Sequence, residues 1–285
     1  MADLPPPADP YEIRPSFLQR HADYVSAAVA FVLTVVLAVV SFPPFKMSEF
    51  AYAMLAPGVF WAYRRPRLKL YVWTMFAAQA VAWTIILGWL HNVTWVGLFL
   101  LGPFVGAWIG TWYLAVWWTM PRMLGQPTPV RLLALVGLAG AWVVIEWSRT
   151  WLLGGFSWLP LAASQWERAS ILQISAFTGA YGVSFVLVAM NVGFAAYGHR
   201  LLCEGETGLR KRSQEFFLAL FLLIVCLTVH VQETFNRGRY SVPLGRVGFV
   251  QPYIPQEVKW DPAKGPGIVD ILEKTTLEAA ATKPD

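Results

Sequence analysis

Long apolar runs, interrupted by charged or Pro-containing breaks, constrain this chain more than any other feature of its sequence. A helix that crosses a membrane needs about 20 mostly apolar residues, because the hydrocarbon layer is roughly 30 Å thick and each helical residue rises about 1.5 Å. The 285 residues are 56% hydrophobic and only 14% charged, which is more apolar surface than one soluble core can bury. The pattern therefore predicts an all-α bundle of membrane-spanning helices.

The apolar runs predict about seven spans. We expect them near Tyr24–Ser41, Glu49–Tyr63, Leu70–Leu90, Trp95–Met120, Leu132–Leu153, Leu172–Tyr197 and Phe216–Phe235. The second run is short and contains Pro57 and Gly58, which favours a kinked, tilted or re-entrant segment. The first run is too long for a signal-peptide core, so we expect it to stay as a span.

The basic residues gather in alternate loops. Twelve of them flank one side of the predicted spans, namely Arg14, Arg20, Arg64, Arg65, Arg67, Lys69, Arg122, Arg131, Arg200, Arg210, Lys211 and Arg212. Before the tail, the other side carries only Lys46, Arg149 and Arg168. By the positive-inside rule this bias predicts a cytoplasmic N-terminus and places the residues after Phe235 on the far side, in a bacterium the periplasm. The basic residues form no continuous stripe, so we expect no nucleic-acid partner.

The composition changes after Asn236. Arg246–Gln251 follows turn residues (Pro243 and Gly245) and predicts a short buried strand, and Pro266–Thr282 predicts a helix with an imperfect apolar stripe. One strand and one helix bury too little surface for a stable domain, so we expect either further chain or docking elsewhere. The predicted domains are a cytoplasmic N-terminal segment (1–23), a transmembrane helix bundle (24–236) and the incomplete start of a second, non-membrane domain (237–285).

The segment Glu146–Gln165 is the most unusual part of the membrane region. Glu146 and Arg149 lie about one helical turn apart, which predicts either a mutual ion pair at a helix end or a role in shaping a substrate cavity. The following loop predicts either a rigid aromatic platform or an ordinary interfacial aromatic belt, and its characteristic residues are Gly154, Gly155, Phe156, Trp158 and Pro160.

Two other patterns predict helix packing. Small residues recur every four positions at Gly102, Gly106 and Gly110, so a neighbouring backbone can approach closely there. Three polar side chains inside spans are expected to be interhelical hydrogen-bond partners, namely Gln79, Gln173 and Asn191.

The sequence shows no complete catalytic constellation. It carries no P-loop, HExxH, GxSxG or Rossmann glycine pattern in a credible context. Cys203 and Cys226 have no CxxC spacing and no nearby His cluster, so we expect no disulfide framework, metal site or cofactor from them.

Three stretches resemble the apolipoprotein N-acyltransferase family in order and spacing: GFSWLPLAASQ, QISAFTGAYGVSFVLVAMN and GRVGFVQPYIPQEVKWDP. Pro252-Tyr253 stands where the family usually has Gly-Asn. The resemblance implies a membrane helix bundle followed by the first β-α unit of a nitrilase-like (carbon–nitrogen hydrolase) α-β-β-α sandwich. It implies a bacterial inner-membrane enzyme that transfers an acyl chain from a phospholipid to the N-terminal cysteine amine of diacylated lipoproteins.

The resemblance also implies which residues surround the site. The family's catalytic Glu, Lys and Cys have no counterpart in these 285 residues, so we expect no catalytic residue here and no acyltransferase activity from these residues alone. The expected substrate-binding positions are Glu146, Arg149, Phe156 and Trp158 in the loop under the catalytic domain, Trp260 near the active site, and Gln251 in the segment after the first nitrilase strand. Gln165 matches the same loop, and Ile254, Pro255 and Gln256 match the segment after the first nitrilase strand.

Two other functions stay open on the sequence alone. One is a non-enzymatic membrane scaffold or lipid-binding protein. The other is a transporter, which the scarcity of charged residues inside the spans and the lack of a clear inverted repeat make less favourable.

Overall fold

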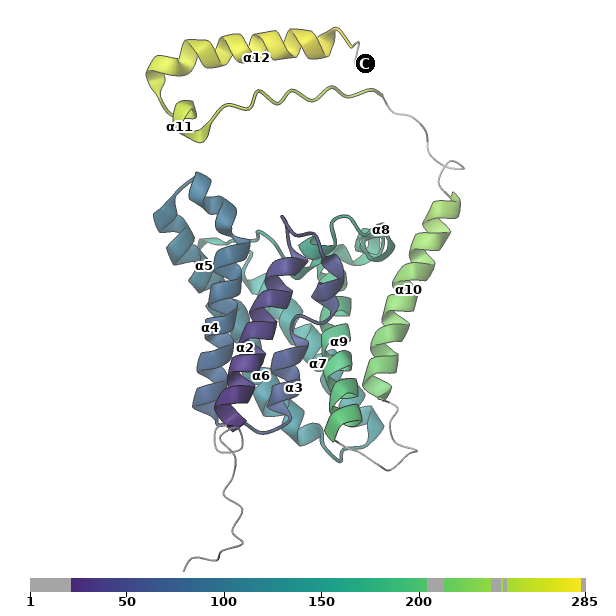
Figure 1. The fold of residues 1–285 in the computed structure, drawn as a ribbon. Helices are drawn as coiled ribbons and strands as arrows, with labels where there is room; N and C mark the ends of the chain where they lie inside the picture. Colours follow the sequence, from purple (N-terminus) through teal and green to yellow (C-terminus); the bar gives the residue numbers. More distant parts are fainter. Residues whose placement is uncertain (1–21, 204–212, 237–241, 243–244, 283–285) are drawn as a thin grey trace, which may run out of the picture.

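The computed structural model describes residues 22–203, 213–236, 242 and 245–282 of the chain. The predictions for residues 1–21, 204–212, 237–241 and 243–244 lie outside the described residues, and so do Arg14, Arg20, Arg210–Arg212 and Pro243. Within the described ranges all regular secondary structure is helical, in a bundle followed by a separate helical tail (Figure 1).

The bundle runs from α2 to α10. In chain order its elements are α2 (Ala22–Ser41), η1 (Ser48–Tyr52), α3 (Ala56–Ala62), α4 (Leu68–Ile86), η2 (Gly88–Asn92), α5 (Trp95–Gly110), α6 (Trp112–Thr119), η3 (Met120–Met123), α7 (Thr128–Ser148), η4 (Leu152–Gly154), η5 (Leu161–Gln165), α8 (Ala169–Leu172), α9 (Ser175–Cys203) and α10 (Gln214–Asn236). The tail contains α11 (Gln256–Lys259), η6 (Pro262–Lys264) and α12 (Gly265–Ala280).

Five helical segments of the described residues are long and apolar enough to cross a membrane: Ala22–Ser41, Trp95–Met123, Thr128–Ser148, Ser175–Cys203 and Gln214–Asn236. They match five of the expected spans and confirm the membrane character of the chain. The third expected span is α4, which has 19 residues and lies beside α2 and α5 but is not among the five. The second is broken into η1 and the seven-residue α3. For α3 and α4, spanning stays a prediction.

The bundle has two chemically different ends. At the lower end in Figure 1, α2 and α4 begin and α9 ends, and we call this the basic end because Arg64, Arg67, Arg131 and Arg200 belong to it. At the opposite end lies the chain between α7 and α9 (residues 149–174), which we call the α7–α9 loop. The described residues therefore keep the predicted alternation of basic and less basic ends.

Glycines bring α4 and α5 into backbone contact, as the sequence pattern predicts. A Cβ atom at Gly102 would lie 2.6 Å from Thr84 Cα, and one at Gly106 would lie 2.4 Å from the Gln79 carbonyl oxygen. Real Cβ atoms do not approach backbone this closely, so the α4–α5 seam depends on the absence of these side chains.

We expect Gly106→Ala to lower the thermal unfolding temperature of the detergent-purified protein, because the new methyl group must push α4 and α5 apart. Gly140→Ala on α7 is the matched control, since a Cβ there meets nothing within 4 Å. That control should be neutral or stabilising by about 0.5–1 kcal/mol, as Ala is the better helix former. Equal unfolding temperatures for the two variants would contradict a tight seam.

Asn191 on α9 holds the break between η1 and α3. Its Oδ1 accepts hydrogen bonds from the backbone N–H groups of Leu55 (2.6 Å) and Ala56 (3.2 Å). Its Nδ2 donates to the carbonyl oxygens of Ala51 and Leu187, both at 2.8 Å. The first N–H groups of a helix lack partners within it, and the buried Asn191 amide supplies one at the start of α3.

The predicted role of the polar span residues, interhelical hydrogen bonding, is confirmed for Asn191, and Gln79 makes only a weak bond of this kind. Gln79 Nε2 makes one long bond, 3.5 Å, to the hydroxyl of Tyr113 on α6. Gln173 makes no side-chain hydrogen bond within the described residues and instead lines a hollow of about 350 Å³ beside α8. The prediction of an interhelical bond is wrong for Gln173.

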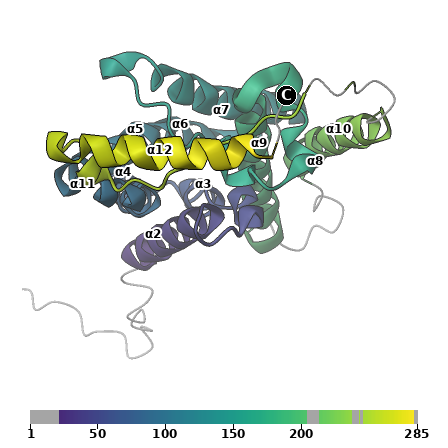
Figure 2. The same ribbon diagram turned by 90° about the horizontal axis from the view of Figure 1, so that it is seen from above.

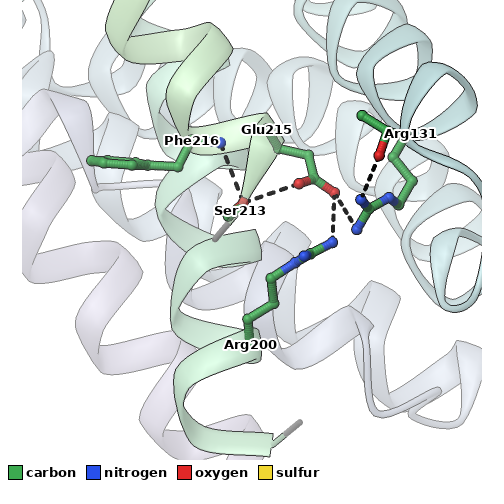
Figure 3. Close-up of polar contacts among 6 residues, drawn as sticks. Arg131, Arg200, Ser213, Glu215 and Phe216 are labelled. Carbon is green, nitrogen blue, oxygen red and sulfur yellow. Dashed lines mark hydrogen bonds and ion pairs between the residues drawn. The ribbon is translucent and has the colours of Figure 1, made fainter. Parts of the chain in front are cut away.

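A buried charge cluster fastens α10 at the basic end (Figure 3). Glu215 Oε1 lies 3.2 Å from Arg131 Nη1 on α7 and 3.7 Å from Arg200 Nη2 on α9. Ser213 Oγ donates to Glu215 Oε2 at 3.0 Å and accepts the N–H of Phe216 at 3.3 Å. All residues of α10 are described, and only Glu215, Ala219 and Cys226 among them are buried. The cluster is therefore the main polar attachment of this helix.

Glu215→Gln should lower the free energy of unfolding by about 3 kcal/mol, because it leaves two largely buried guanidinium groups without their carboxylate. Glu167→Gln is the control, since its 3.0 Å pair with Lys46 has side chains 33% and 50% exposed. Exposed pairs contribute at most about 1 kcal/mol. Denaturant titration in mixed micelles measures the free energy of unfolding of both variants. An equal loss of this free energy in the two variants would show that the cluster does not fasten α10.

The tail departs from expectation in one element. The sequence predicts a strand at residues 246–251, but none forms, because the described residues offer no partner strand to take up its N–H and C=O groups. The predicted helix is confirmed as α12. Figures 1 and 2 show α12 lying across the end of the bundle that carries the α7–α9 loop, but none of residues 245–282 is buried.

Candidate functional site

The α7–α9 loop leaves helical geometry immediately after α7. It contains four residues with left-handed φ angles, namely Leu153 (53°), Gly154 (91°), Gly155 (76°) and Leu159 (52°). At Gly155 a Cβ atom would lie 2.4 Å from the carbonyl oxygen of Thr150, so only glycine fits this turn. The fold holds the loop in this conformation through side chains from α7 and α9.

Glu146, near the end of α7, is 3% exposed and binds the loop rather than a charged group. Its Oε1 accepts a hydrogen bond of 2.6 Å from the N–H of Leu161, the first residue of η5. The next N–H, that of Ala162, donates to Ser184 Oγ on α9 at 3.1 Å. The first N–H groups of a helical turn have no hydrogen-bond acceptor within that turn. Glu146 and Ser184 accept the hydrogen bonds of the first two N–H groups of η5.

Arg149, the residue after α7, is also 3% exposed and holds the preceding part of the loop. Its Nη2 donates to the carbonyl oxygens of Trp158 at 3.0 Å and Leu159 at 3.3 Å. Its guanidinium carbon lies 5.2 Å from the ring centre of Trp83 on α4, within the range of a cation–π contact. Arg149 therefore connects α4, α7 and the loop.

The predicted mutual ion pair of Glu146 and Arg149 is not formed. Among the ion pairs of the described residues, none joins these two side chains within 4.0 Å. Each carries buried polar atoms without a hydrogen-bond partner in the described part of the chain: Oε2 of Glu146, and Nε and Nη1 of Arg149. Both side chains organise the loop.

The aromatic residues of the loop divide between the core and the surface. Phe156 is half-buried and packs against the core, and its N–H donates to the Arg149 carbonyl oxygen at 2.7 Å. Trp158 is 60% exposed, and its ring centre lies 5.3 Å from that of Trp89 in η2. The loop thus exposes the Trp158 ring beside Trp89 at this end of the bundle.

Further contacts fasten the C-terminal half of the loop to η1. Gln165 Nε2 donates to the Ser48 carbonyl oxygen at 2.8 Å, and Arg168 pairs with Glu49 at 2.7 Å. The pKa of the Glu49 carboxyl lies below its ordinary value, because the carboxyl accepts a hydrogen bond from the backbone of Glu49 itself and faces the guanidinium of Arg168. Both Gln165 and Arg168 therefore stabilise the loop.

The structure brings four of the six predicted site residues together. Glu146, Arg149, Phe156 and Trp158 share the α7–α9 loop and the end of α7 that leads into it. Gln251 and Trp260 lie in the tail, where both are exposed and neither makes a hydrogen bond or ring contact with the bundle within the described residues. The described residues also contain no cluster of three or more His, Cys, Asp or Glu side chains that could hold a metal ion.

Comparison with known proteins shows to which protein family the bundle and its loop belong. Residues 34–193 match the family described as the apolipoprotein N-acyltransferase N-terminal domain, which covers most of the bundle and the whole α7–α9 loop. The chain belongs to the apolipoprotein N-acyltransferase family.

One family member extends the likeness into the tail. The apolipoprotein N-acyltransferase of Geobacter metallireducens is 30% identical over 283 residues, which is 92% of this chain and 49% of that protein. Those of Caulobacter vibrioides and Methylococcus capsulatus are each 26% identical, over 69% and 77% of this chain and 38% and 43% of the relatives. The chain thus spans about half or less of the length of these relatives.

Sequence reasoning missed two side chains that organise the bundle of this protein. Ser184 on α9 has no signal in the sequence, because a single Ser in an apolar helix is common. Glu215 stands at the edge of an apolar run, where a charged residue usually meets water. Only the positions of Arg131 and Arg200 in the folded chain show that Glu215 is buried and paired with both arginines.

We expect Arg149→Gln to increase amide hydrogen exchange of residues 156–162 by about tenfold or more. Hydrogen bonds that involve a charged group contribute about 1.5–3 kcal/mol, and this variant removes two of them from the loop. Arg168→Gln is the control, because it removes only an exposed pair from the far half of the loop. Equal exchange of residues 156–162 in both variants would contradict the role of Arg149.

Proposed function

We propose that the protein takes part in the last acylation of bacterial lipoproteins, in which an acyl chain passes from a phospholipid to the N-terminal cysteine amine of a diacylated lipoprotein. The observation that carries this proposal is the membership of the chain in the apolipoprotein N-acyltransferase family, supported along 92% of its length by one relative. The membrane character of the bundle agrees with a lipid donor and a lipid-anchored acceptor.

In this proposal the helix bundle from α2 to α10 supplies the membrane part of the enzyme. The reaction needs a thiolate nucleophile, a general base and a group that stabilises the oxyanion, and the family provides these as Cys, Glu and Lys. These three catalytic groups have no counterpart in residues 1–285. Residues 237–285 then form the start of the nitrilase-like domain, in the periplasm, with the N-terminus of the chain in the cytoplasm and the bundle in the inner membrane.

The α7–α9 loop would guide the acyl chain between lipid and the catalytic domain. Trp158 and Phe156 offer an apolar surface that Arg149 and Glu146 hold in place through the loop backbone. A rigid surface loses little conformational entropy when a flexible acyl chain binds to it. Gln251 and Trp260 would contact the substrate from the tail side.

N-acylation can be measured by mass spectrometry of a lipoprotein N-terminal peptide, in membranes from a strain depleted of its own enzyme and supplied with the complete reading frame of this protein. Trp158→Ala should lower the rate about tenfold, which corresponds to the loss of a contact of about 1.4 kcal/mol. Trp73→Ala on α4 is the matched control, because this side chain is 75% exposed and lies outside the loop.

The outcomes separate the function from the role of the loop. No N-acylation by the unaltered protein would overturn the proposed function. Full activity of Trp158→Ala would leave the reaction standing and exclude the loop surface. Residues 1–285 expressed alone should give no N-acylated peptide, and detection of that product would refute the assignment of the nucleophile to another part of the enzyme.

A further inference from the structure

A groove runs along the bundle between α2, α3 and α9, away from the α7–α9 loop. It encloses about 530 Å³, and its lining is apolar except for Ser26 and Arg64. This volume lies within the range of about 300–1,000 Å³ that is typical of small-molecule sites. The groove therefore has the size and the lining of a site for an apolar ligand with a polar end.

The broken second span creates the groove. α3 has only seven residues, and α2 and α9 each pack against it (Figure 1). The floor consists of small residues, including Ala30, Ala56 and Gly198, where larger side chains would fill the space. The hollow follows from the same break in the helix that Asn191 stabilises.

The groove has the length of one membrane leaflet. Its lining on α2 extends from Val25 to Leu37, which corresponds to about 18 Å of helix at about 1.5 Å per residue. Half of the roughly 30 Å hydrocarbon layer is about 15 Å. Neighbouring α2 side chains such as Val29 and Val32 are more than half exposed, so this face of the helix meets lipid. An acyl chain that enters from the adjacent leaflet would match the groove from end to end.

The polar end of the groove is positively charged. Arg64 is exposed, and Nη1 makes a long hydrogen bond of 3.4 Å to Ser26 Oγ at the start of α2. Arg67 and Lys69 follow in the sequence and belong to the same basic end. Basic residues at a membrane surface attract anionic headgroups, and a basic pocket between spans favours a phosphate.

We propose that this groove binds one acyl chain of an anionic glycerophospholipid from the leaflet at the basic end, with the headgroup phosphate on Arg64. The bound lipid would fill the space that the short α3 leaves between α2 and α9. This site opens at the basic end of the bundle, and none of its lining residues belongs to the α7–α9 loop, so it is distinct from the proposed acyl-donor path and does not depend on catalysis.

The test uses the full protein in detergent with phosphatidylglycerol that carries a photoactivatable diazirine in its acyl chain. After irradiation, peptide mass spectrometry should locate the adducts in residues 25–37, 53–64 and 194–202. Arg64→Gln should lower the yield about fivefold, the effect expected for one basic residue at the surface. The equivalent phosphatidylcholine probe should label these segments weakly and should not respond to this variant.

A second variant tests the cavity itself. Gly198→Leu should abolish labelling by filling the groove, and it should fold because a Cβ at this position meets only Phe60, at 3.7 Å. Gly140→Leu on α7 is the matched control and should label normally. Labelling outside the three segments, equal labelling by both lipids, or full labelling of Gly198→Leu would overturn the proposal. Cross-linked dimers through α2 in place of lipid adducts would also overturn it.

Discussion

The structure depends on one constraint: a backbone N–H or C=O group inside a membrane bundle finds no water and must be paired within the protein. Most of the chain meets this constraint by being helical. Two non-helical stretches of the described residues meet it through side chains instead: the break between η1 and α3, and the α7–α9 loop. Asn191 pairs three backbone groups around the first break. Glu146, Arg149 and Ser184 pair those of the loop. These four buried polar side chains are thus placed beside the stretches where the helices stop.

This placement gives the bundle a rigid frame with different properties at its two ends. The glycine seam joins α4 to α5, and Glu215 attaches α10 to α7 and α9 at the basic end. At the other end the loop is fastened to η1, α7 and α9 and exposes Trp158. Each polar attachment connects elements that are distant in the sequence, so the aromatic surface keeps its position relative to the whole bundle.

The broken second span shapes the bundle away from the loop. Because α3 is short, α2 and α9 are separated by a hollow that opens at the basic end, while the loop surface lies at the opposite end. The two proposals of lipid contact therefore concern different leaflets and different chemistry. One end offers an aromatic surface near the tail. The other offers an apolar groove with a guanidinium group at its mouth, suited to a resident lipid.

Several features could be predicted from the residues alone: the helical membrane character, the glycine seam, the bonding role of Asn191, helix α12 and the family. They depend on local apolar length, residue size or short motifs, whose free energy is set within a few turns of helix. Three others needed the folded chain. Glu146 and Arg149 bind loop backbone instead of each other, Glu215 is buried between two arginines, and residues 246–251 form no strand. The partners of a buried charge or of a strand come from distant parts of the chain, and no local pattern specifies them.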